Sequence, residues 1–129
     1  MLSQKGLNTV PFKSLLKQLL EDIPGALGAI IVDWEGESVD QVSMINEYDI
    51  KILGAHSGII LTQLREALLR TDSGALNEVV IRTGRNKTLI SPLTEDYLLI
   101  LQLGPESIAA FATYKMSQCV AALRSEFEF

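Results

Sequence analysis

The stretch LLEDIPGALGAIIVDWEG (residues 19–36) joins the end of a helix, a chain break, a buried strand and a tight turn. The helix comes first. From Pro11, apolar residues recur in steps of three and one as far as Ile23, which is one stripe of an amphipathic helix. Proline is well placed in a first turn, where its missing N–H costs little. Pro24-Gly25 then ends the helix.

After this break the stretch predicts a β-hairpin. Residues 26–32 are apolar throughout, which is typical of a strand buried on both faces. Asp33-Trp34-Glu35-Gly36 is a turn sequence, in which Gly36 can adopt a positive φ. Residues 38–43 mix valines with polar residues, so we expect a weaker strand near an edge.

The rest of the chain extends this pattern to a single α+β domain over residues 11–129, while the polar, aperiodic residues 1–10 are expected to form a loose arm. The order is helix, hairpin, helix, three-stranded meander, helix. It predicts a sandwich of three helices and a five-stranded, mostly antiparallel sheet. The remaining elements are expected at residues 49–71 (helix), 76–83, 88–91 and 97–103 (strands, the last one central) and 106–124 (helix).

Composition excludes several classes of protein. The formal charge of −5 and the lack of any Lys/Arg cluster argue against nucleic-acid binding. No apolar run approaches the roughly 20 residues that span a bilayer. A lone cysteine and an N-terminus without a signal-like apolar core predict a cytoplasmic protein. The mean hydropathy of +0.22 is high for a small domain, which suggests burial against a partner.

The second helix is the most unusual segment. From Ile52 to Leu64 it has no charged residue, with histidine counted as neutral. Glycines cost roughly 1 kcal/mol each inside a helix, and Gly54 and Gly58 share one face. Their missing side chains allow close approach either to the helix's own sheet or to a second copy across a two-fold axis. We favour the second copy, with an interface that includes Gly54, Ala55, Gly58, Ile59 and Leu61.

Residues that could carry chemistry are few, so we expect no enzyme, no metal and no cofactor. His56 has Ser57 beside it, but adjacent helical residues do not face each other, so no triad is expected. Cys119 lies on an apolar helical stripe and is interpreted as a core residue. One histidine and one cysteine cannot supply a zinc site, and no phosphate-binding glycine loop is present.

Acidic residues and an aromatic meet at the hairpin turn. The carboxylates of Asp33, Glu35 and Glu37 either are solvated or hold a weak cation, and we favour solvation. Trp34 either covers the hairpin or, if exposed, anchors a binding partner.

The order and spacing of these motifs resemble the roadblock/LC7 family over about residues 12–124. The resemblance rests on the amphipathic helix, Ile23-Pro24-Gly25, the small-residue strand and the Asp33-to-Gly36 turn, followed by the glycine-bearing second helix. It implies a homodimer in which the second helices pack together and the third strands, residues 76–83 with Val79 and Ile81, pair edge to edge.

The resemblance also implies a function without catalysis. Roadblock/LC7 proteins are mostly scaffolds or regulators of small Ras-like GTPases, and some bacterial members activate their GTPase. On this basis we expect a homodimer that binds such a GTPase or a related signalling partner through outward groups of the second helices: Gln63, Glu66 and Arg70, with Trp34 as a candidate anchor. The alternative is a small-molecule sensor of PAS- or GAF-like architecture, with a ligand in an apolar pocket.

Overall fold

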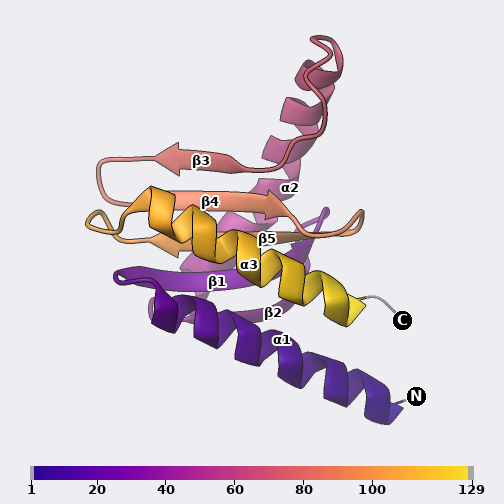
Figure 1. Cartoon of the computed structure of the whole chain (residues 1–129), viewed down its shortest axis with the longest axis vertical. Helices are drawn as coiled ribbons and strands as arrows, with labels where there is room; N and C mark the ends of the chain where they lie inside the picture. Colours follow the sequence, from indigo (N-terminus) through magenta and orange to yellow (C-terminus); the bar gives the residue numbers. More distant parts are fainter. Residues whose placement is uncertain (1, 128–129) are drawn as a thin grey trace.

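The structure is a computed structural model that describes the backbone of residues 2–127 and the side chains of residues 12–127. Its elements follow the predicted α-β-β-α-β-β-β-α order (Figure 1). The α+β fold class is therefore confirmed. The elements are α1 (Leu2–Asp22), β1 (Ala26–Asp33), β2 (Ser38–Ser43), α2 (Glu47–Leu69), β3 (Val79–Arg82), β4 (Lys87–Pro92), β5 (Tyr97–Leu103) and α3 (Ala109–Phe127).

The strands form one antiparallel sheet in the order β2-β1-β5-β4-β3. β5 lies in the middle, as its apolar sequence predicted, and pairs with β1 through Ile30 opposite Ile100. The same residue of β5 lies opposite Ile90 of β4. β2 and β3 are left as the two edges of the sheet, far apart in space.

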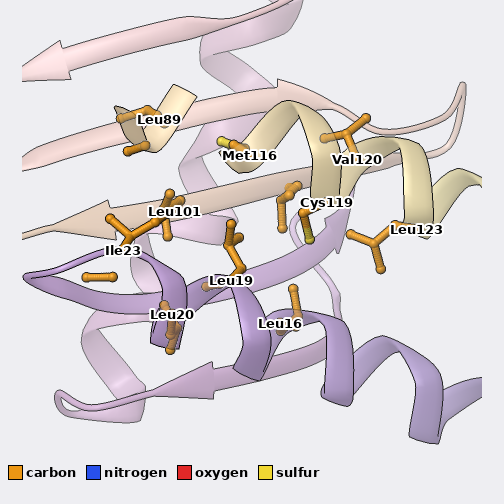
Figure 2. Close-up of a cluster of buried hydrophobic side chains, with 14 of the residues drawn as sticks. Leu16, Leu19, Leu20, Ile23, Leu89, Leu101, Met116, Cys119, Val120 and Leu123 are labelled. Atoms are coloured by element: carbon orange, nitrogen blue, oxygen red, sulfur yellow. The ribbon is translucent and has the colours of Figure 1, made fainter. Parts of the chain in front are cut away.

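Helices α1 and α3 pack together on one face of the sheet, where they build the larger of two cores (Figures 1 and 2). The stripe predicted from the sequence supplies the α1 side of this core, and α3 contributes Met116 and Leu123. Side chains of β5 and β4 lie beneath them. The residues labelled in Figure 2 are Leu16, Leu19, Leu20, Ile23, Leu89, Leu101, Met116, Cys119, Val120 and Leu123.

Helix α2 crosses the opposite face alone and packs on β1, β5 and β2. It contributes Ile50 and Leu61 to a smaller core, and both side chains are fully buried. One helix is narrower than a five-stranded sheet, since strands lie about 4.8 Å apart and a helix with its side chains is about 10 Å wide. The α2 face over β4 and β3 is consequently left without a covering helix among residues 2–127.

The ends of several elements differ from the sequence analysis. The backbone is helical from Leu2, where a loose arm was expected, so Pro11 lies inside α1. A polar segment that adjoins a stable helix can extend it by simple propagation. α2 is capped by Asn46, whose side chain accepts from the N–H of Tyr48, so the helix begins two residues before its expected start at residue 49. β3 is shorter than expected, and α3 begins later and runs further.

No helix in the described part of the chain combines the length and apolarity that crossing a membrane requires.

Candidate interaction surface

The glycines of α2 face the protein's own sheet, which corrects the interpretation that we favoured from the sequence. A Cβ at Gly54 would lie 2.7 Å from Val32 Cγ1, and one at Gly58 would lie 2.9 Å from the carbonyl carbon of Trp34. Both positions are buried. The missing side chains therefore let α2 approach the end of β1 and the following turn, and the two glycines are not available to a partner helix.

The other predicted α2 interface residues divide between the two sides of the helix. Leu61 is fully buried in the smaller core, so it too belongs to the protein's own interior. Ile59 is 57% exposed, and Ala55 is exposed although its backbone lies against Gly36 of the β1–β2 turn. The apolar surface of α2 that is free to meet a partner is thus its outer side.

This outer side forms a stripe along the whole of α2. Its first half is apolar and its second half is polar, and all of its members are exposed. Steps of three and four residues keep them on one helical face. We call it the α2 stripe, made of Tyr48, Ile52, Ala55, Ile59, Gln63, Glu66 and Arg70. The three residues predicted to bind a signalling partner therefore continue the same surface as Ile59.

A cavity of about 580 Å³ lies beside α2, over the part of the sheet that no helix covers. Its walls are mostly apolar and include Leu53 and Ile60 from α2 and Ile81 and Ile90 from the sheet. Gln102 of β5 also lines it. This side chain is 8% exposed, and its Oε1 has no hydrogen-bond partner among the described residues. The cavity thus combines apolar walls with one polar group that lacks a partner.

Edge strand β3 borders this cavity and has unpaired backbone groups. The N–H of Thr83 donates to the carbonyl of Asn86 at 2.9 Å, and these residues continue the β3–β4 register. In an antiparallel ladder the residues that bond to a neighbouring strand alternate. Val79 and Ile81 therefore bond towards β4. The backbone groups of Glu78, Val80 and Arg82 point away from the sheet, and no described side chain bonds to them.

The opposite edge, β2, is different because its outward N–H is occupied. The N–H of Met44 donates to Leu27 of the β1 strand, so by alternation the N–H of Gln41 points outward. It donates instead to Oδ1 of Asp40 at 2.8 Å. The same carboxylate forms an ion pair with Lys13 of α1 at 3.4 Å. Among the described residues, β3 is therefore the less obstructed of the two edges.

Trp34 is half-buried and covered, which supports the interpretation of this residue as a cover for the hairpin. Its ring packs against the smaller core, and the guanidinium carbon of Arg65 lies 4.1 Å from the ring centroid. Such a cation–π contact is typically worth about 0.5–1 kcal/mol at an exposed site. The ring is thus already in contact with α2, although its use by a partner remains a prediction.

His56 and Ser57 each hydrogen-bond to a carbonyl of α2 and not to each other. Nδ1 of His56 lies 2.9 Å from the carbonyl oxygen of Ile52, while the hydroxyl of Ser57 donates to that of Leu53. Burial raises the pKa of the Cys119 thiol to about 11, so the nucleophilic thiolate is scarce at neutral pH.

The acidic turn uses its carboxylate internally. Asp33 Oδ1 accepts from the N–H groups of Glu35 and Glu37, both at 2.9 Å. Across the described residues, no cluster of three or more His, Cys, Asp or Glu side chains is arranged to hold a metal ion.

Comparison with known proteins identifies the fold and its family. The family model described as "Roadblock/LC7 domain" matches residues 13–103, which is most of the chain. The chain belongs to the roadblock/LC7 family. No curated protein sequence matches it.

Solved structures of roadblock/LC7 proteins share the fold. A roadblock/LC7 domain from Streptomyces avermitilis aligns with a TM-score of 0.81 at 20% identity, over 88% of this chain and 95% of that one. The gliding protein MglB from Thermus thermophilus gives 0.84 at 14% identity, over 92% and 90%. MglC from Myxococcus xanthus gives 0.65 at 24% identity, over 90% and 98%.

Three residues of this roadblock/LC7 surface were not singled out from the sequence. Gln102 interrupts the apolar β5, and a lone polar residue in a central strand is a detectable signal. Glu78 and Arg82 flank the short β3, but their importance depends on which backbone groups point outward. That orientation follows from the register with β4, which a single sequence does not reveal.

Proposed function

We propose that this protein is a non-enzymatic, homodimeric regulator or scaffold of a small Ras-like GTPase. The observation that supports the dimer is that three surfaces able to bind a partner lie next to one another beside α2. They are the uncovered sheet face with its cavity, the open β3 edge and the apolar half of the α2 stripe. A second copy would supply one helix and one strand, which is what this side lacks.

The energetics agree with association of this kind. Ile52 is 40% exposed and Ile59 is 57% exposed. Full burial of an isoleucine is worth about 1.5–3 kcal/mol, so covering the exposed half of each side chain contributes about 1 kcal/mol per residue, or about 2 kcal/mol per copy. An open strand edge beside apolar residues also favours pairing over exposure to water.

A measurement of mass in solution tests the dimer. Sedimentation equilibrium at micromolar concentration is expected to give twice the 14.2 kDa of the chain. Ile59→Asp should shift the mass towards the monomer with unchanged circular dichroism, whereas Glu95→Lys, in the exposed β4–β5 turn, should not. A wild-type monomer at this concentration would overturn the homodimer.

The GTPase partner is supported by membership of the roadblock/LC7 family and by the similarity to MglB and MglC. The polar half of the α2 stripe is the surface that we assign to it, because in a homodimer two such halves would remain exposed. Glu66 and Arg70 offer charges of both signs there. Regulation would act by ordering the GTPase's own catalytic groups or by holding it in place.

Affinity capture from host lysate tests this partner. Lysate loaded with a non-hydrolysable GTP analogue, or with GDP, is passed over the immobilised dimer, and retained small GTPases are identified by mass spectrometry. The retained GTPase is then purified and its binding and hydrolysis rate are measured with wild type and Arg70→Glu. Loss of binding in the variant is expected. Recovery of no GTPase in either nucleotide state would contradict the proposal.

A second candidate function is that of a small-molecule sensor, and one observation favours it. The cavity beside α2 contains the carboxamide of Gln102, whose Oε1 has no hydrogen-bond partner among the described residues, within mostly apolar walls, which is the composition of many ligand sites. Native mass spectrometry of the purified protein tests this function. A stoichiometric adduct lost in Gln102→Leu would favour the sensor, while its absence would favour a second copy as the occupant.

A further inference from the structure

The open β3 edge has a symmetric pattern of charge. Glu78 and Arg82 lie two residues before and two residues after Val80, and all three have outward-pointing backbone groups. Val79 and Ile81 pack towards the α2 face, so the side chains of the other three share the α3 face. One acid and one base are therefore placed at equal distances from a central valine on the same side of the strand.

In the pairing of the two β3 strands that the family resemblance implies, we propose that the two-fold axis lies at Val80 and that two Glu78–Arg82 ion pairs select this register. The proposal rests on the homodimer proposed above and specifies its contacts. In antiparallel pairing about Val80, Glu78 lies directly opposite Arg82 of the partner subunit. Val80 lies opposite its own equivalent, and symmetry creates the charge pair twice.

Backbone geometry restricts the choice of register. Two antiparallel strands bond only where outward-pointing residues lie opposite each other, so Glu78, Val80 and Arg82 must meet residues of the same set. The axis at Val80 brings all three into hydrogen-bonded pairs. An axis at Val79 or Ile81 keeps only two of them paired within this set.

Electrostatics disfavour the registers with an axis at Glu78 or Arg82. An axis at Glu78 places two glutamates opposite each other, and an axis at Arg82 does the same with two arginines. Like charges directly opposite across a strand pair are destabilising, whereas opposite charges are favourable. The register about Val80 is therefore the one that joins the largest number of outward residues with complementary charges.

Glu78 is half-buried and has no cationic side chain beside it among the described residues of one copy. The side chain is half-buried beside α3, where the hydroxyl of Thr113 donates to its Oε2 at 3.4 Å. Burial raises the pKa of this carboxyl. Neither Glu78 nor Arg82 has an ionic partner among the described side chains. Arg82 of the partner subunit would provide the missing counter-charge to Glu78.

Charge reversal in the full-length protein tests the register. Glu78→Arg or Arg82→Glu alone replaces two attractive pairs by two repulsive ones, and each should raise the dimer dissociation constant roughly 30-fold. A 1:1 mixture of the two variants should form a heterodimer close to the wild-type affinity, because both cross-strand pairs become attractive again. Glu95→Lys, a charge reversal in the exposed β4–β5 turn away from this surface, is the matched control and should leave the dimer intact.

Sedimentation velocity of each variant and of the mixture, with circular dichroism of each, provides the readout. The expected result is folded, mostly monomeric single variants and a dimeric mixture. Dimeric single variants, or a mixture that stays monomeric while both variants are folded, would overturn the register. A wild-type monomer would instead contradict the homodimer itself, so the two failures are distinguishable. If one variant fails to fold, Glu78→Gln and Arg82→Gln replace the charge reversals, and each should lower the dimer affinity by a smaller factor. An unchanged affinity in both variants would overturn the charge pair.

Discussion

Replacing Gly58 with alanine should destabilise the fold itself, because the added methyl group has no room. Its Cβ would lie 2.9 Å from the carbonyl carbon and 3.3 Å from the Cα of Trp34, and closer still to the carbonyl oxygen. These atoms are backbone, so they cannot rotate away as a flexible side chain would. Either α2 or the turn after β1 must shift.

The magnitude follows from two opposing effects. Overpacking against backbone costs about 3 kcal/mol, at the upper end of the usual range. Alanine in place of glycine inside a helix returns about 1 kcal/mol. The free energy of unfolding should therefore fall by about 2 kcal/mol, which for a chain of this size lowers Tm by about 8 °C.

Thermal unfolding followed by circular dichroism and by the fluorescence of the single tryptophan, Trp34, measures this loss. Gly54→Ala should cost less, since the atom it meets at 2.7 Å is the side-chain Cγ1 of Val32. Gly84→Ala is the control, because no atom lies within 4 Å of its added Cβ. A Gly58→Ala protein as stable as wild type, or more stable, would refute the reasoning and place this glycine in open space.

Three further predictions concern the surface and the core. Ile59→Asp should raise the dimer dissociation constant at least about tenfold. The Tm of the dilute monomer should stay within about 2 °C of wild type, because this exposed side chain lies outside both cores, and a larger fall in the monomer Tm would contradict this. Arg65→Ala should increase quenching of Trp34 fluorescence by iodide and cost about 0.5–1 kcal/mol, while unchanged quenching would show that the guanidinium does not cover the ring. At pH 8, Cys119 of the folded protein should react with iodoacetamide about 100-fold more slowly than in the urea-unfolded chain, since burial raises the pKa of its thiol from 9.0 to about 11 and lowers the thiolate population. Equal rates of alkylation, followed by mass spectrometry, would refute the burial.

The sequence predicted the order of elements well, because the helices and central strands carry strong apolar periodicity. The stripe ending at Ile23 and the apolar residues 97–103 both lie in the cores where the pattern placed them. Pro24-Gly25 does separate α1 from β1, and Gly25 and Gly36 both adopt a positive φ. Local rules decide such features, so they can be derived from a single chain.

The side of α2 that faces the sheet could not be predicted from these local sequence patterns. Its sequence is apolar on several sides, so periodicity could not distinguish the side that meets the sheet from the side that faces outward. Gly54 and Gly58 were assigned to a partner, whereas they meet Val32 and the backbone of Trp34. The difference depends on how closely the helix crosses β1, which is a tertiary property. Gly54, Gly58 and Leu61 lie in the protein's own interior, while an interface role for the exposed Ala55 and Ile59 stays a prediction.

The N-terminal helix illustrates a second limit. Residues 2–10 have no apolar periodicity of their own, yet their backbone continues α1. Extension of an existing helix adds one hydrogen bond per residue without a new nucleation step. Propagation of this kind depends on the neighbouring segment, so a residue-by-residue pattern does not reveal it.

The two edges of the sheet differ in their free backbone groups, and this difference would limit the number of copies that pair through the sheet. The N–H of Gln41 on β2 donates a hydrogen bond to the Asp40 carboxylate. No described side chain forms such a bond with the outward backbone groups of β3. In the proposed homodimer, both outer strands of the joined sheet would be β2. The bonded N–H of Gln41 would disfavour the addition of a further strand there. The hydrogen bond from Gln41 to Asp40 would thus favour a closed dimer over a continuous β-sheet filament.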